Sequence, residues 1–163
     1  MSDDEVLARE RFVDSFGAAF HEAGIPPMSS RVFAYLLVVD REKVSARELA
    51  EGLGASAAAV SGAVNYLIGV GMIERAPGTR GDRQHYYRLF PGDIWTAILL
   101  RRLPLVERWY ESMRAGIADL GHEPQAGSPL YESALYFEFM RQETPAIMER
   151  WKAYRDAHLG DQG

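Results

Sequence analysis

The sequence predicts a mainly helical protein with one small β-hairpin, and three observations support this. Residues 45–71 contain two short apolar-periodic segments, each preceded by a serine that can cap a helix. Residues 72–89 contain two strand-like runs around a turn-rich tip. Residues 4–23 and 92–158 carry apolar side chains at helical spacing. Together they predict a winged helix-turn-helix flanked by N- and C-terminal dimerisation helices.

Composition excludes several classes of protein. With 163 residues and 47% hydrophobic content, the chain can form one domain, or one small domain with dimerisation arms. It has no cysteine, so disulfides, cysteine-based zinc sites and thiolate catalysis are excluded. The four histidines are widely separated, and no metal or other cofactor is expected. The acidic N-terminus and the lack of a long apolar run predict a cytoplasmic protein without a membrane span.

The charge distribution matters more than the net charge of −5. Residues 29–90 contain eight Lys or Arg and six Asp or Glu, which is 8 − 6 = +2. The rest of the chain therefore carries −5 − 2 = −7. A basic segment on an acidic body is compatible with binding of nucleic acid through that segment.

The first half of the chain predicts four helices. The first covers 4–23 and stops at Gly24 and Pro26-Pro27. Ser29 or Ser30 is expected to cap the second, which extends to about Asp40. Ser45 and Glu48 form a capping box for the third, which Gly52 and Gly54 close. Ser56 caps the fourth, which ends at Gly71 and buries a stripe made of Val60, Val64, Leu67 and Ile68.

The second half predicts a hairpin and two long helical segments. Residues 72–75 and 84–89 are the expected strands, with a turn-rich tip at 76–83. A long helix follows from Gly92, which Pro104 should kink or divide. After a linker at 121–129, a final helix runs to about His158, with an interruption expected at Pro145.

These elements group into three regions. Residues 1–28 are expected to be an N-terminal dimerisation helix, 29–90 a winged helix-turn-helix, and 91–163 a C-terminal helical dimerisation region. The outer helices carry more apolar surface than a small winged helix can cover. We therefore expect a homodimer, because two-fold symmetric proteins gain affinity on two-fold DNA sites. The alternative is burial of these helices against the head of the same chain.

The fourth helix has the properties of a recognition helix. Small side chains at its entry would let its backbone approach DNA closely, and Asn65 can pair with the N6/N7 edge of adenine. No Arg or Lys lies between Ser56 and Glu74, so readout would depend more on shape and water. The alternative is an alanine-rich packing helix with a solvated Asn65. The candidate DNA-binding residues here are Ser56, Ala57, Ala58, Ser61, Gly62, Asn65 and Tyr66.

Basic residues around the hairpin are further candidates. Arg80 or Arg83 can enter a narrow minor groove, where the negative potential is enhanced. Asp82 is a poor DNA contact and would instead orient a neighbouring arginine. The alternative is an ordinary solvated hairpin. The complete set of candidates outside the recognition helix is Arg47, Arg75, Thr79, Arg80 and Arg83.

Residues 29–90 resemble the MarR (multiple antibiotic resistance regulator) family of winged-helix repressors. The resemblance rests on Ser45-x-x-Glu48-Leu-Ala, Val60-Ser61, Leu67-x-x-x-Gly71-Met-Ile-Glu-Arg75 and Gly81-Asp-Arg83. The run from Gly81 to Leu89, followed by Asp93-Ile-Trp95, is similar to the GbsR-type branch, some members of which respond to choline or related osmolytes. The family implies a homodimer, major-groove entry by 56–66, minor-groove entry by the wing, and repression relieved by a small ligand. The chain departs from the family in lacking a basic residue in the recognition helix.

Aromatic residues in the flanking helices are candidates for an effector pocket. Phe16, Trp95, Trp109 and Tyr110 could enclose a quaternary ammonium group by cation–π attraction. The alternative is that these rings form the dimer core.

Two functions follow from these features. The first is a dimeric transcriptional regulator of double-stranded DNA that a small molecule releases. The second is a winged-helix protein-interaction module without sequence-specific DNA binding. An enzyme is not expected, because the sequence has no nucleophile elbow, phosphate loop or credible pair of catalytic carboxylates.

Overall fold

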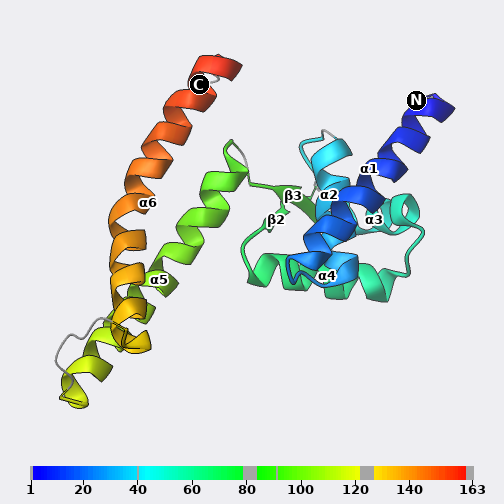
Figure 1. Cartoon of the computed structure of the whole chain (residues 1–163). Helices are drawn as coiled ribbons and strands as arrows, with labels where there is room; N and C mark the ends of the chain where they lie inside the picture. The colour runs from blue at the N-terminus through cyan, green and yellow to red at the C-terminus, as the bar shows by residue number, and fades with distance from the viewer. Residues whose placement is uncertain (1, 40, 79–83, 91, 122–126, 161–163) are drawn as a thin grey trace. The chain divides into compact units, whose positions relative to one another are not determined.

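The computed structural model describes residues 2–39, 41–78, 84–90, 92–121 and 127–160 (Figure 1). The chain divides into two compact units, residues 1–98 and 99–163. Most of the described residues are helical, and the strands form one three-stranded sheet. The predicted fold class, a winged helix with flanking helices, is confirmed.

The first unit contains five helices or their parts and all three strands. In chain order these are α1 (Asp3–Glu22), α2 (Pro27–Val39), β1 (Val44–Ser45), α3 (Ala46–Leu53), α4 (Ala57–Gly69), β2 (Ile73–Ala76), β3 (Tyr86–Leu89) and the start of α5 (Ile94–Asp119). The helix predicted over 4–23 and the two predicted strands are therefore present, with ends shifted by one or two residues.

The sheet is antiparallel with strand order β1–β3–β2. Tyr87 of β3 lies opposite Val44 on one side and Arg75 on the other. Sequence patterning missed β1, because a strand of two residues is too short to show alternation. This strand connects the start of α3 to the wing, and Ala46 N donates to His85 O over 2.9 Å.

The core of the first unit lies where α2, α3 and α4 meet the sheet. Its largest fully buried side chains include Phe33, Leu49, Leu67 and Ile73. A row of rings extends from this core along α1 and α2. Successive centroids are 5.5, 5.4, 5.1 and 6.1 Å apart, in the order Phe12, Phe16, Phe20, Phe33 and Trp95.

The predicted cap of α2 is wrong. The helix begins at Pro27, whose fixed φ and missing N–H suit a first helical position. Ser29 and Ser30 lie inside the helix and are buried, and each hydroxyl donates to a backbone carbonyl. The acceptors are Ala63 O at 3.4 Å for Ser29 and Pro26 O at 3.2 Å for Ser30. Burial of the first turn against α4 thus directs both hydroxyls away from a capping role.

Gly52 lies within α3 instead of closing it, and Gly54 is the left-handed C-cap with φ +59°. The prediction that both glycines terminate the helix is therefore correct for Gly54 alone. The structure explains Gly52 by contact, because a Cβ atom at this position would overlap the phenol of Tyr35.

We expect Gly52→Ala to lower the free energy of unfolding by about 1–3 kcal/mol, the usual cost of overpacking. Chemical denaturation measures this change. Gly62→Ala is the matched control, since an added Cβ there meets no described atom within 4 Å outside its own helical turns. It should raise stability by up to about 1 kcal/mol through helix propensity. Equal effects of the two substitutions would contradict the proposed contact with Tyr35.

The second unit consists of α5 from residue 99 onward and α6 (Pro129–Leu159). The two helices pack through Trp109 and Phe137, whose ring centroids are 5.3 Å apart. Arg141 pairs with Glu107 at 2.9 Å and lies 4.6 Å from the ring centroid of Tyr110.

Both helices continue through their internal prolines. The expected interruption at Pro145 is wrong, and Pro104 does not divide α5. Each proline removes one helical hydrogen bond, and packing and the remaining bonds of these long helices outweigh that cost. None of the described helices combines the length and the apolar character that crossing a bilayer requires.

Candidate nucleic-acid interface

Helix α4 has a buried face and an exposed face that differ sharply in side-chain size. Ser56 caps its N-terminus and accepts a hydrogen bond from Ala59 N over 3.2 Å. The buried face packs into the core through Val60, Ala63, Val64 and Leu67. The exposed face consists of Ala57, Ala58, Ser61, Gly62 and Asn65, at spacings of one helical turn. Six of the seven candidate residues of this helix, Ser56 included, are thus exposed together, and Tyr66 is half-buried against the core.

This exposed face is suited to close approach of a flat or grooved partner. No side chain on it is longer than that of Asn65. Gly62 has open space around it, and glycine in a helix interior is about 1 kcal/mol less favourable than alanine. The fold therefore tolerates a residue that weakens the helix but leaves no side chain projecting from this part of its exposed face.

The helix before it, α3, is held by a complete capping box. The Glu48 carboxylate accepts from Ser45 N and from Ser45 Oγ, each over 2.8 Å, while Glu48 N donates to Ser45 Oγ over 3.2 Å. Arg41 pairs with the same carboxylate at 2.7 Å. The hydrogen bonds from Ser45, and then Arg41, lower the pKa of Glu48 below its ordinary value of 4.5. The predicted capping box is confirmed.

This lowered pKa predicts a pH-dependent contribution of Glu48 to stability. A carboxylate with a depressed folded-state pKa stabilises the protein above its unfolded value, and the gain is lost as pH falls through the folded value. Relative to Glu48→Gln, the native protein should be more stable by about 0.5–1 kcal/mol at neutral pH, after allowance for solvent screening. Denaturation series above and below pH 4.5 measure the difference. A difference that grows on acidification would contradict the assignment.

Four of the seven described arginines of the first unit, Arg31, Arg41, Arg47 and Arg88, are paired with a carboxylate. Arg47 pairs with Glu51 at 2.7 Å on the exposed side of α3, which raises its pKa further through that hydrogen bond. Arg88 pairs with Glu74 across β3 and β2 at 2.7 Å, with both side chains about 30% exposed. These pairs reduce the charge that is available to a nucleic acid.

Two cations at the base of the hairpin are not paired with a carboxylate among the described residues. Arg75 on β2 is exposed and makes no ion pair there. Lys43 Nζ donates to Pro77 O over 2.8 Å and lies 4.8 Å from the ring centroid of Tyr86. Lys43 was not among the candidates, because only β1 pairing places it beside a residue 34 positions away. It anchors the chain where β2 leads into the wing tip.

The predicted site is thus only partly visible in the structure. The exposed residues of α4 form one surface, Arg75 lies on β2, and Arg47 lies on α3. Thr79, Arg80, Asp82 and Arg83 fall outside the described residues, so their predicted roles at the wing stay predictions.

The predicted effector residues fall into two separate groups. Phe16 and Trp95 belong to the aromatic row of the first unit. Trp109 and Tyr110 belong to the second unit, where they contact Phe137 and Arg141. Within the described residues, no group of three or more acidic or histidine side chains is placed to hold a metal ion.

Comparison with known proteins gives matches over both halves of the chain. Residues 23–84 match a family model described as the MarR family, and 93–154 match one described as an MmpR5-like MarR family transcriptional regulator. The chain is 33% identical over 113 residues to the HTH-type transcriptional regulator MmpR5 of Mycobacterium tuberculosis, covering 69% of this chain and 67% of that protein. A crystal structure of a transcriptional regulator aligns with a TM-score of 0.75 and 28% identity, over 90% of this chain and 99% of the other.

Proposed function

The chain belongs to the MarR family of DNA-binding transcriptional regulators, and from this premise we propose that it binds a pseudo-palindromic operator as a homodimer. In this proposal, α4 enters the major groove, and the β2–β3 hairpin contacts the adjacent minor groove. The observation that carries the proposal is the exposed face of α4, which follows the Ser56 cap. None of its residues, Ala57, Ala58, Ser61, Gly62 and Asn65, has a side chain longer than that of asparagine.

Shape and water then dominate base readout. The face offers Asn65 as its single bidentate amide and Ser61 as a hydroxyl, but no guanidinium. A smooth helix can sit deep in the groove, where ordered waters bridge backbone and base edges. Affinity would come from phosphate contacts by cations that are not paired with a carboxylate, and Arg75 is one described example.

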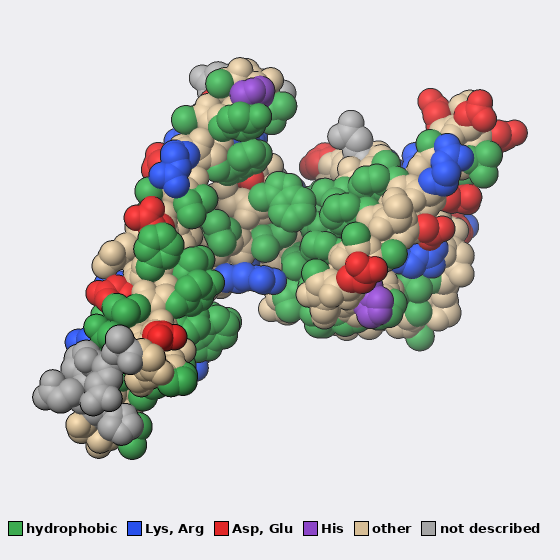
Figure 2. All heavy atoms as spheres, in the orientation of Figure 1, with side chains coloured by type: hydrophobic (Ala, Val, Ile, Leu, Met, Phe, Trp, Pro, Cys, Tyr) green, Lys and Arg blue, Asp and Glu red, His purple; other side chains and the backbone are tan. Residues whose placement is uncertain are grey.

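The second unit supports the homodimer. Its described residues bury just two side chains, Ala134 and Thr144, while large apolar side chains remain exposed along α5 and α6 (Figure 2). Tyr136 is 57% exposed and Phe139 is 59% exposed. Large apolar side chains that are exposed together in this way usually mark a surface that another molecule covers. The α5 and α6 helices of a second copy would cover these apolar side chains and place two winged helix-turn-helix units on one duplex.

We further propose that a small molecule relieves repression, as the family resemblance implies. The aromatic row that contains Phe16 and Trp95 is one candidate for its binding site, and the residues Trp109 and Tyr110 are another. The similarity of residues 81–95 to the GbsR-type branch remains a prediction.

Fluorescence anisotropy with the DNA flanking the protein's own gene tests the proposal. We expect tight binding that resists an unrelated competitor duplex and weakens as salt rises, because phosphate contacts release counterions. Binding no tighter than to the unrelated duplex, at two salt concentrations, would instead support the protein-interaction module.

Two substitutions should separate base readout from phosphate contact. Asn65→Ala should relax the preference at one base pair by about 1–3 kcal/mol and leave the salt dependence unchanged. Arg83→Ala should weaken binding to all duplexes and reduce the slope of log K against log salt by about 1. Both are measured by anisotropy titrations on a set of single-base operator variants. Equal binding by the native protein and both variants would argue against this surface.

A further inference from the structure

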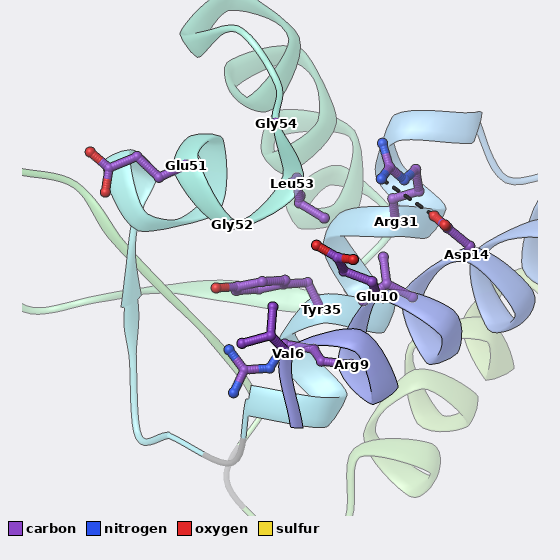
Figure 3. A pocket seen from close by; sticks show the side chains of 11 residues that line it. Val6, Arg9, Glu10, Asp14, Arg31, Tyr35, Glu51, Gly52, Leu53 and Gly54 are labelled. Carbon is purple, nitrogen blue, oxygen red and sulfur yellow. Dashed lines mark ion pairs between the residues drawn. The ribbon is translucent and has the colours of Figure 1, made fainter. Parts of the chain in front are cut away.

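A cavity of about 480 Å³ lies within the first unit, between α1, α2 and the C-terminal end of α3 (Figure 3). Its walls carry charged and polar groups from all three helices, namely Arg9, Glu10, Asp14, Arg31, Tyr35 and the turn Gly52–Gly54. The α1 residues that line it recur at helical spacing and differ from those of the aromatic row. Its size is within the range of small-molecule sites in proteins.

Several polar groups on these walls lack partners within the described chain. The carboxylate of Glu10 makes no hydrogen bond or ion pair with a described residue, and neither does the hydroxyl of Tyr35. Arg31 has one loose ion pair, at 3.4 Å to Asp14, and its Nε is buried without a hydrogen-bond acceptor. Buried polar groups in native proteins are normally satisfied, so the buried Arg31 Nε without an acceptor indicates a polar occupant. Glu10 is exposed, and its carboxylate has no partner within the described chain that would compete with such an occupant.

The charges select the class of that occupant. Glu10 offers an unneutralised carboxylate, which attracts a protonated amine. Arg31 offers unused guanidinium donors, which match a carboxylate with charge-assisted hydrogen bonds. Tyr35 also lines the cavity, with its hydroxyl directed away from Glu10 and Arg31 (Figure 3). We propose that this cavity binds a small zwitterion with an amine and a carboxylate, of the size of a free amino acid.

Ligand binding in this cavity would change the position of α4, the proposed recognition helix, and this step rests on the proposed function. Gly52 packs directly against the Tyr35 phenol, so α3 has no free space on that side. The cavity wall at Gly52–Gly54 continues through Ala55 to Ser56, which caps α4. A ligand that displaces Tyr35 or Gly54 would therefore change the orientation of α4. Occupancy should change duplex affinity even though no cavity residue lies on the exposed face of α4.

Isothermal titration calorimetry of the full chain without DNA tests the site itself. The probes are individual free amino acids, with the matching amines that lack a carboxylate and the matching acids that lack an amine. We expect one or more amino acids to bind, and both truncated probes to bind at least about tenfold more weakly, since each loses a charge-assisted contact.

Substitutions locate the binding to this cavity. Glu10→Gln keeps the size of the side chain and should weaken the binding of that amino acid by about tenfold. Glu22→Gln makes the same charge change at an exposed position of α1 outside the cavity, and it should bind like the native protein. Circular dichroism and thermal unfolding confirm that the variants remain folded.

The outcomes are distinguishable from those of the operator experiment. No binding by any free amino acid, or equal weakening by Glu10→Gln and Glu22→Gln, overturns the proposed site. Binding that is lost in Glu10→Gln supports the site even if the operator has not been found. Anisotropy with and without the amino acid then tests coupling to DNA, and an unchanged affinity overturns the proposed link to α4.

Discussion

Gly62→Glu is expected to weaken duplex binding by about 100-fold or more and leave the fold intact, since opposing like charges cost several kcal/mol. Gly62 is exposed at the centre of the α4 face, and a side chain added there meets open space. The new carboxylate would meet the phosphates or base edges at the closest approach of the helix. The larger side chain would also prevent the backbone of α4 from approaching the DNA closely.

The size and the charge of this change can be separated. Gly62→Ala adds one methyl group and should reduce affinity far less, and Gly62→Gln adds the same volume as glutamate without its charge. Ala18→Glu is the matched control for the loss of net charge, because Ala18 is an exposed helical residue of α1. Anisotropy with the operator gives affinities, and thermal unfolding checks the fold. Equal losses in Gly62→Glu and Ala18→Glu, with both variants still homodimers by size-exclusion chromatography, would show that α4 does not form the interface.

Phe33→Ala is expected to lower the free energy of unfolding by about 3–5 kcal/mol, the usual cost of truncating a buried aromatic side chain. Phe33 has 0% exposure and contacts both Phe20 of α1 and Trp95 of α5. Its removal would leave a cavity at the point where three helices meet. Since small domains have only about 5–15 kcal/mol of stability, much of the protein would unfold on modest heating.

The matched control is Phe12→Ala at the exposed end of the same aromatic row. Phe12 is 36% exposed and stacks on one ring, Phe16. Its truncation removes less buried area and should cost about 1 kcal/mol. Urea denaturation of the two variants measures both values. A similar loss in the two variants would contradict the view that Phe33 contributes more to stability than Phe12 because it is buried.

Sequence patterns over a few residues predicted the α3 and α4 helices of the winged helix-turn-helix correctly. The capping box of Ser45 and Glu48 and the cap at Ser56 involve residues three positions apart, so their geometry follows from the chain itself. The apolar stripe of α4 determined which side of that helix is buried and which side is exposed. The small exposed face could therefore be identified before any tertiary contact was known.

The errors have a common cause, which is that packing overrode local preference. Ser29 and Ser30 are good capping residues, but α2 begins earlier and buries both of them against α4 and the preceding turn. Pro145 is a helix breaker, but α6 continues through it. Gly52 reads as a stop signal, but it is glycine because Tyr35 occupies the adjacent space. In each case the deciding contact comes from outside the local segment or from the length of the whole helix.

Contacts between distant residues decided what the sequence left open. Lys43 meets Pro77 only after β1 has paired with β3, and Glu10, Arg31 and Tyr35 surround one cavity only because α1 packs on α2. Periodicity and capping determined the helices and the hairpin, because they depend on hydrogen bonds and side chains a few residues apart. The Lys43–Pro77 hydrogen bond, the cross-strand Arg88–Glu74 pair and the polar cavity depend on contacts between residues far apart in the sequence, which no local pattern encodes. Tertiary structure therefore decided which charges are free to meet DNA and where a small ligand could bind.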